Sequence, residues 1–402
     1  MPTKLIYHTD PFTLEFTAHI IGKTILPNDR VGIALAQTYF YPTGGGQEYD
    51  TGTIGDARVI EVTLDDAGNV LHIVDRDVIG EIVPARIDGE RRRAFMQHHS
   101  AQHLLSHTFE HARDLETLSA KISIESPATI DLPAAQISES DLIRVENLAN
   151  EIIRADRAIK SYFVAETDIG KIPLRRPPKV SGQIRIVEID ALDYSACGGT
   201  HCTSTGMIGI LKILRVELRG ERTRIHFVAG QRALDYFQDA HAITARLALD
   251  FSIAPKDILA TVERQRESLR AALTQIEELG AYKLRADAAQ MIANAEHVGA
   301  VRIAIVFLRD QTIQQARALA LILKTDANLV SVLATRDDAK IGLIVTCGEN
   351  TGANANALLR ELLAEIGGRG GGDARLAQGG GAATDDQLNT LLANANKSAR
   401  MN

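Results

Sequence analysis

Residues 195–202 read SACGGTHC and place two cysteines and a histidine within six positions, around a pair of glycines. Gly198 and Gly199 predict a turn rather than a helix between Cys197 and His201. A tight turn can bring a thiolate and an imidazole to one ion, and these donors suit Zn²⁺. Read alone, the stretch permits a redox pair, half of a zinc knuckle, or one side of a catalytic metal site.

The partner for the third reading is HSAQH, residues 99–103, within a stretch over 91–113 that we expect to be helical. Because His99 and His103 are four residues apart, their imidazoles share one helical face and can share a metal ion. A metalloprotease zinc helix needs a glutamate directly after its first histidine, and Ser100 stands there instead. The spacing is therefore compatible with a metal site, and the missing glutamate disfavours a metalloprotease.

The cysteines argue against redox chemistry. Four residues separate Cys197 from Cys202, whereas a C-x-x-C motif has two between its cysteines. Three cysteines, an odd number, predict no disulfide framework. We therefore interpret Cys202 as structural.

Composition sets the class of protein. The chain has 402 residues, of which 45% are hydrophobic, and this length predicts two or three domains. We see neither a signal peptide nor an apolar run near the roughly 20 residues that span a bilayer, so we expect a cytoplasmic protein with no membrane partner. The net charge of −7 disfavours a protein that coats nucleic acid non-specifically. Residues 171–185 and 212–224 are nevertheless locally basic, and these stretches are either solvated or face RNA.

The predicted fold class is α+β. Strand-and-turn texture over 1–90 predicts a small antiparallel β-barrel, and 91–240 an α/β domain with a central antiparallel sheet. Residues 241–297 predict a helical, coiled-coil-like linker, and 298–402 a C-terminal α/β domain with a glycine-rich tail.

Two local signals sharpen this division. Ser138 followed by Asp141 predicts a capped helix start. Apolar residues at alternating spacings of four and three between Ile258 and Lys283 predict a coiled-coil arm or a helical hairpin, suited to a dimer contact or to packing on the next domain.

A glycine run stands in YFYPTGGGQEYDTG, residues 39–52. Glycines let backbone amides approach a ligand closely, although this run lacks the G-K-[ST] ending of a Walker loop. The alternative is that these glycines only form a turn and bind no ligand.

The motifs FYPTGGGQ–DTG, HSAQHLL and CGGTH–TGMIG, in this order, resemble the editing region of alanyl-tRNA synthetase and the freestanding AlaX-type alanyl-tRNA editing proteins. The GGGQ form and the stretch LRRPPKVSGQIRIVEID favour the freestanding kind. The tail GGRGGGDARLAQGGG resembles the end of the DHH-associated domain that closes long AlaX proteins and the synthetase. Because only a barrel-sized segment precedes the editing motifs, we expect no amino-acid activation and no use of ATP.

The resemblance implies one zinc ion per chain, held by His99, His103, Cys197 and His201. It also implies hydrolysis of tRNA-Ala that carries serine, with glycine as a further candidate. Zinc could lower the pKa of water to about 7, polarise the carbonyl, or hold the amino group. His201 could instead stand beside the ion as a general base.

Other residues are candidates for binding the substrate or its RNA. The substrate-binding candidates are Gly44, Gly45, Gly46, Gln47, Thr117, Ser119 and Lys121, of which the last three read equally as surface strand residues. The RNA-binding candidates are Arg175, Arg176, Lys179, Arg369 and Arg375, although the glycine-rich tail has the composition of a flexible linker. A homodimer through the C-terminal half is a further expectation.

Two other functions remain open. One is a tRNA-binding or regulatory module of the same fold without activity, against which the intact quartet of candidate ligands argues. The other is a phosphoesterase, suggested by the tail, although we see no Asp-His-His signature of such enzymes in the chain.

Overall fold

The computed structural model describes residues 3–27, 30–65, 68–134, 136–338 and 340–401. They divide into two compact units, Met1–Pro255 and Lys256–Asn402. Both units mix helices with sheets, which confirms the predicted α+β class. The finer division into four parts, at residues 90, 240 and 297, stays a proposal. Across the described residues, no helix combines the length and apolarity that a bilayer crossing requires.

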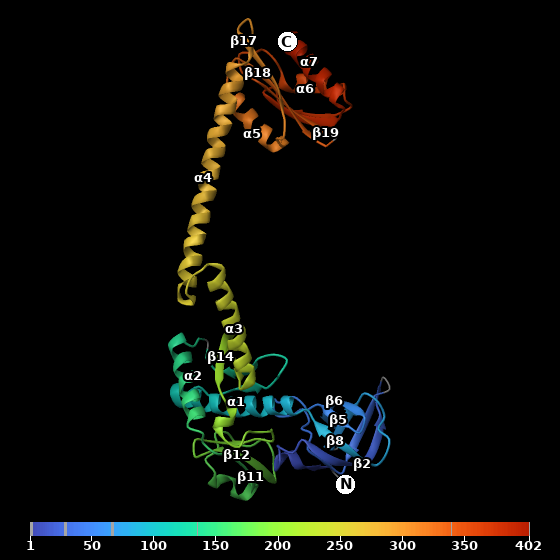
Figure 1. Cartoon of the computed structure of the whole chain (residues 1–402), viewed down its shortest axis with the longest axis vertical. Helices are drawn as coiled ribbons and strands as arrows, with labels where there is room; N and C mark the ends of the chain where they lie inside the picture. The colour runs from blue at the N-terminus through green and yellow to red at the C-terminus, as the bar shows by residue number, and fades with distance from the viewer. Residues whose placement is uncertain (1–2, 28–29, 66–67, 135, 339, 402) are drawn as a thin grey trace. The chain divides into compact units, whose positions relative to one another are not determined.

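Six strands of the first unit close into an antiparallel barrel in the order β2-β3-β7-β6-β5-β8 (Figure 1). Their bounds are β2 (Glu15–Ile25), β3 (Val31–Leu35), β5 (Gly52–Ile54), β6 (Ala57–Leu64), β7 (Val70–Val74) and β8 (Ile82–Ile87). Alternation fills the interior of the barrel, because Val83, Ala85 and Ile87 of β8 are buried and the residues between them are exposed. The predicted N-terminal barrel is confirmed. A short parallel pair, β1 (Lys4–Leu5) with β4 (Gln37–Thr38), lies outside it.

Helix α1 (Gly89–Arg113) starts directly after the barrel and carries HSAQH, as predicted. Asp88 caps it by accepting hydrogen bonds from the backbone N–H groups of Glu90 and Arg91. A buried ion pair between Arg92 and Asp50 attaches the helix to the chain that follows the glycine loop. Removing one partner of such a pair costs about 3–5 kcal/mol, so the start of the helix is firmly placed.

Two antiparallel sheets complete the first unit, in the orders β14-β15-β10-β9 and β11-β12-β13. The strands are β9 (Ser119–Lys121), β10 (Ala128–Leu132), β11 (Ile159–Ala165), β12 (Gln183–Ile189), β13 (Asp193–Ala196), β14 (Leu211–Arg219) and β15 (Arg222–Ala229). Two further helices are α2 (Glu139–Arg154) and α3 (Gln231–Asp250), and the short 3₁₀ turns are η1 (Ile6–His8), η3 (Glu166–Lys171), η4 (Thr205–Ile208) and η5 (Pro255–Asp257). The predicted cap is confirmed, since the Ser138 hydroxyl accepts from the Asp141 N–H at 3.1 Å.

One apolar core joins α1 to both sheets. Phe95, Leu105 and Phe109 of α1 pack with Phe227 of β15 and Val187 of β12. Helix α1 is therefore fixed against both sheets by its apolar residues.

The second unit has a six-stranded sheet in the order β16-β17-β18-β19-β21-β20, in which β17 and β18 are parallel and the other pairs antiparallel. The strands are β16 (Glu296–Val298), β17 (Val301–Leu308), β18 (Leu329–Asp337), β19 (Lys340–Cys347), β20 (Arg369–Gly372) and β21 (Leu376–Ala382). The helices are α4 (Ile258–Ala293), α5 (Ile313–Leu323), α6 (Ala355–Ala364) and α7 (Asp385–Met401). The last turns of α4 join the core beneath α5, through Ala288, Leu284 and Met291.

The glycine-rich tail forms the hairpin β20–β21 at the edge of the sheet, so it is folded although its composition is that of a flexible linker. Gly370 pairs with Gly379 across the hairpin. A Cβ on Gly370 would lie 2.4 Å from the Cα of Gly379 and 2.9 Å from Leu363 of α6. Glycine is required here because two strands and a helix meet too closely for side chains.

Candidate metal centre

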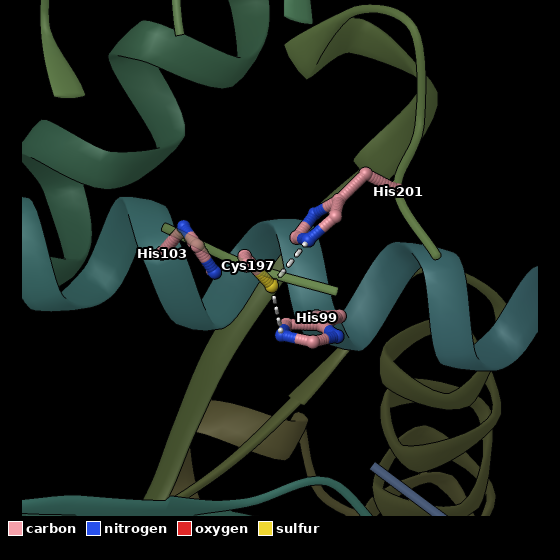
Figure 2. Close-up of side chains that lie close together, drawn as sticks. All are labelled: His99, His103, Cys197 and His201. Carbon is pink, nitrogen blue, oxygen red and sulfur yellow. Dashed lines mark hydrogen bonds between the residues drawn. The ribbon is translucent and has the colours of Figure 1, made fainter. Parts of the chain in front are cut away.

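Four side chains converge on one point of the first unit (Figure 2). His99 and His103 come from α1, and Cys197 and His201 from the turn after β13. Their candidate ligand atoms all lie within 4.8 Å of one another. The Cys197 Sγ is 3.4 Å from His99 Nε2 and 3.3 Å from His201 Nε2. A tetrahedral zinc ion would separate sulfur and nitrogen ligands by about 3.5 Å, so the cluster fits one such ion.

The second nitrogen of each imidazole faces a different polar side chain. Nδ1 of His99 lies 2.8 Å from Gln47 Oε1, and Nδ1 of His201 lies 3.2 Å from Ser100 Oγ. Nδ1 of His103 lies 3.5 Å from a carboxylate oxygen of Asp193. Each ring thereby turns Nε2 towards the cluster, which is how histidines are held around metals. For His201 this orientation favours a ligand over a base that stands beside the ion.

Proton affinities in the cluster suit a metal. Burial raises the pKa of the Cys197 thiol, but His99, His201 and His103 outweigh it and bring this pKa well below its usual range. Burial, with His99, lowers the pKa of His201 to about 3. A thiolate and a neutral imidazole are the forms that bind zinc.

His103 differs from the other imidazoles. Burial lowers its pKa, but the contacts with Asp193 and Cys197 outweigh burial and raise this pKa to about 9. In the metal-free centre His103 therefore carries the proton, which a metal would have to displace.

The turn between Cys197 and His201 needs its second glycine. A Cβ on Gly199 would lie 2.1 Å from Cε1 of His99, so only a bare backbone fits beside that ring. Arg185 fixes the same turn, because its Nη1 donates to the carbonyl oxygens of Cys197 at 2.8 Å and Gly199 at 2.9 Å. Arg185 is buried, although the sequence placed it in a basic stretch read as solvated or RNA-facing.

The loop GGGQ is a tight turn that delivers Gln47 to the centre. Gly44 and Gln47 exchange both backbone hydrogen bonds, and Gly45 and Gly46 have φ of +54° and +86°. A Cβ on Gly46 would lie 2.6 Å from the carbonyl oxygen of Ala120 in β9. Both observations demand glycine.

Gln47 is buried, and its amide makes three contacts in the centre. Oε1 lies 2.8 Å from His99 Nδ1 and accepts from the Thr200 N–H at 3.2 Å. Nε2 donates to the Thr200 hydroxyl at 3.0 Å. The structure thus places Gln47 behind His99, a candidate metal ligand, and joins it to both halves of the candidate site.

The three candidates near β9 differ in direction. Thr117 is buried and donates to Ser106 Oγ at 2.7 Å, one helical turn beyond His103. Ser119 is exposed and donates to Asp131 at 2.8 Å, and Lys121 is exposed with its Nζ 4.0 Å from Glu48. Of the three, Thr117 is the one turned inward.

The RNA-binding candidates divide by their ion pairs. Arg175 lies 3.0 Å from Asp193, Arg176 contacts Glu116, and Arg375 contacts Glu349. Lys179 and Arg369 are exposed and have no ion pair with any described residue. The basic stretch 212–224 is also largely paired, through Lys212, Arg219 and Arg224 with Glu146, Glu217 and Asp131.

Comparisons with known proteins match both units. The second additional domain of threonyl and alanyl tRNA synthetases matches residues 184–225, and the DHHA1 domain matches residues 301–401. The first match includes Cys197 and His201. It also includes Arg185, Asp193 and Gly199, which surround them in the fold.

Alanine–tRNA ligases are similar over nearly the whole chain. The ligase of Methanopyrus kandleri is 32% identical over 411 residues, which cover 96% of this chain and 44% of the ligase. Those of Thermococcus kodakarensis and Natronomonas pharaonis are 31% and 32% identical, over 94% and 95% of this chain and 41% and 42% of each ligase. The chain therefore spans less than half the length of these ligases.

Proposed function

We propose that this chain, an AlaX-like relative of the alanine–tRNA ligases with a second additional domain and a DHHA1 domain, hydrolyses tRNA-Ala charged with the wrong amino acid. The predicted resemblance to the editing and C-terminal regions of alanyl-tRNA synthetase is confirmed. The observation that carries the proposal is the cluster of His99, His103, Cys197 and His201, two of whose members lie inside the matched synthetase domain.

In this proposal the four side chains hold one Zn²⁺. When bound, the ion supplies a Lewis acid that polarises an ester carbonyl or lowers the pKa of water. Gln47 and Ser100 fix the rings of His99 and His201 through their Nδ1 atoms. Arg185 holds the carbonyls on either side of the glycine turn, so the thiolate of Cys197 stays against the two rings.

The substrate is a serine ester of tRNA-Ala, with the glycine ester as a second candidate. Serine exceeds alanine by one hydroxyl, and a site that hydrogen-bonds this group rejects alanine by leaving a polar partner unpaired. Among the proposed substrate-binding residues, Thr117 is buried and hydrogen-bonded beside α1, where a polar group could serve this purpose. Among the proposed RNA contacts, Lys179 and Arg369 offer exposed charges without an ion pair to any described residue.

Serine release from Ser-tRNA-Ala tests the proposal, with Ala-tRNA-Ala as the control substrate. We expect rapid release from the first, little from the second, loss on zinc chelation and recovery on adding Zn²⁺. A protein that holds stoichiometric zinc but releases no serine would contradict the proposal. That outcome would leave the catalytically inactive tRNA-binding module as the better interpretation.

We further propose that α4 pairs with a second copy of the chain as a coiled coil. Leu269, Leu273 and Ile276 form one stripe on this helix and are 62%, 53% and 64% exposed. Arg264 and Arg266 precede this stripe, Arg270 lies within it, and Glu277 and Glu278 follow it. An antiparallel second copy would bring these opposite charges together. The mass in solution should be that of a dimer, and Ile276→Asp should give a monomer.

A further inference from the structure

Asp193 is a buried carboxylate at the back of the metal centre, only 3% exposed. Its Oδ1 lies 3.0 Å from Arg175 Nε, and its Oδ2 accepts from the Ser195 hydroxyl at 2.9 Å. Arg175 Nη2 in turn donates to the Ser195 hydroxyl at 3.1 Å. The carboxylate is therefore held in place by two neighbours that do not belong to the cluster.

Nδ1 of His103 faces this carboxylate. It is fully buried, makes no hydrogen bond with any described residue, and lies 3.5 Å from Asp193 Oδ2. A buried ring nitrogen without a partner is unusual, and the carboxylate within a short adjustment of it can supply that partner. The opposite nitrogen of the ring, Nε2, is the one that faces the cluster (Figure 2).

The same unit contains a similar group that has no histidine. Asp131 is also buried, with Arg224 and Ser119 as its partners. Arg224 takes both oxygens of Asp131, through Nε at 2.6 Å and Nη2 at 2.8 Å. Both oxygens of Asp131 therefore have a hydrogen bond from the arginine, and no histidine takes part.

The two groups differ in how the arginine binds. At Asp193 the arginine approaches Oδ1 through Nε, and Oδ2 is left to Ser195 and His103. An ion pair that served packing alone would gain from the two-pronged contact seen at Asp131. The one-sided contact at Asp193 instead leaves an oxygen directed at an imidazole.

We propose that Asp193 is a positioning residue of the metal centre, which fixes His103 in the Nδ1-protonated form and presents Nε2 to the ion. This inference rests on the metal centre of the proposed function. Gln47 and Ser100 are the uncharged counterparts behind His99 and His201. Asp193 is the charged member of the three, so it strengthens the donor power of the ring it holds.

Zinc affinity of the full chain, measured by competition with a chromogenic chelator, tests the proposal. Asp193→Asn should still bind one zinc but about 10–100-fold more weakly, the usual loss when an outer partner of a metal-binding histidine is removed. Asp131→Asn is the matched control, because it breaks the same kind of ion pair away from the centre. It should leave zinc affinity within about twofold of the wild type.

A second readout separates positioning from stability. The visible absorption of the Co²⁺-loaded protein reports the geometry of its ligands and should change in Asp193→Asn but not in Asp131→Asn. Ser195→Ala is a second variant for the case in which Asp193→Asn does not fold. It keeps the charges of Asp193 and Arg175, and its zinc affinity should be a few-fold weaker than that of the wild type.

The outcomes are distinct. Unchanged zinc affinity and an unchanged Co²⁺ spectrum in Asp193→Asn would overturn the role of Asp193 while leaving the metal centre intact. If Asp193→Asn does not fold, unchanged zinc affinity in Ser195→Ala would overturn it. A wild-type protein that binds no zinc would contradict the metal centre of the proposed function itself.

Discussion

Helix α1 carries two histidine pairs with the same spacing, His99 with His103 and His107 with His111. The first pair lies with Cys197 and His201 in the cluster. In the second pair the rings stack at 5.9 Å with 5° between their planes, half-buried at His107 and exposed at His111. Spacing along a helix therefore brings two imidazoles to one face, and a second segment of chain decides whether that face becomes a metal site.

The test with the largest expected effect on zinc binding removes one histidine from each pair. His103→Ala should abolish stoichiometric zinc binding, because it takes away one of four donors. His107→Ala leaves the cluster intact and should bind zinc like the wild type. Metal content of the purified proteins, measured by emission spectrometry, gives the result. Loss of zinc in His107→Ala would show that the second pair also belongs to the centre.

The next test changes the turn between Cys197 and His201 and leaves the histidines in place. Gly199→Ala places a methyl group against the His99 ring, at a cost of about 1–3 kcal/mol for an overfilled site. If this cost falls on metal binding, zinc affinity should drop about 5- to 150-fold.

Gly198→Ala is the matched control for this substitution. Its added Cβ would meet the His8 ring at an ordinary 3.7 Å, so zinc affinity should be unchanged. Equal affinities in the Gly199 and Gly198 variants would show that the turn does not set the distance to His99.

A third kind of histidine sharpens the comparison, because both of its nitrogens face oxygen atoms and neither faces another histidine or a cysteine. His72 of β7 is fully buried, with Nε2 2.8 Å from the Thr38 hydroxyl and Nδ1 2.9 Å from the Ile33 carbonyl. Burial lowers its pKa from 6.5 to about 4. The folded barrel thus prefers the neutral ring. The stability that neutral His72 contributes is complete above pH 6.5 and is lost as the pH falls towards 4.

Between pH 7 and pH 5 His72 should cost the barrel about 2 kcal/mol of stability. Hydrogen exchange of β3 and β7, corrected for the intrinsic rate at each pH, measures this loss locally. His72→Gln cannot titrate and should be less sensitive to acid over the same range. An equal response in both proteins would place the acid-sensitive group elsewhere.

The sequence was sufficient for the parts that depend on local patterns. Short β-rich runs between turn signals predicted the barrel, and capping at Ser138 predicted the start of α2. Four-residue spacing placed His99 and His103 on one face, and the glycine pair predicted the turn before His201.

The remaining features depend on contacts between distant segments. Spacing alone treats His107 and His111 like the pair that joins the cluster. Arg185 read as one more charge in a basic stretch, because nothing local marks it as buried beneath the glycine turn. Asp193 stands four residues before Cys197 and gave no signal, since its role depends on a histidine from another element.

The amide of Gln47 reaches a partner 153 residues further along the chain, and Ser100 meets His201 across 101 residues. During synthesis, the residues of the glycine loop and of helix α1 are therefore made long before the ribosome reaches Cys197 and His201, which complete the cluster. Contacts of such long range are slow to form, because the loop between them must close first. If the cluster holds zinc as proposed, the ion can bind only after His201 has been made, so zinc binding would be a late step in the folding of the first unit.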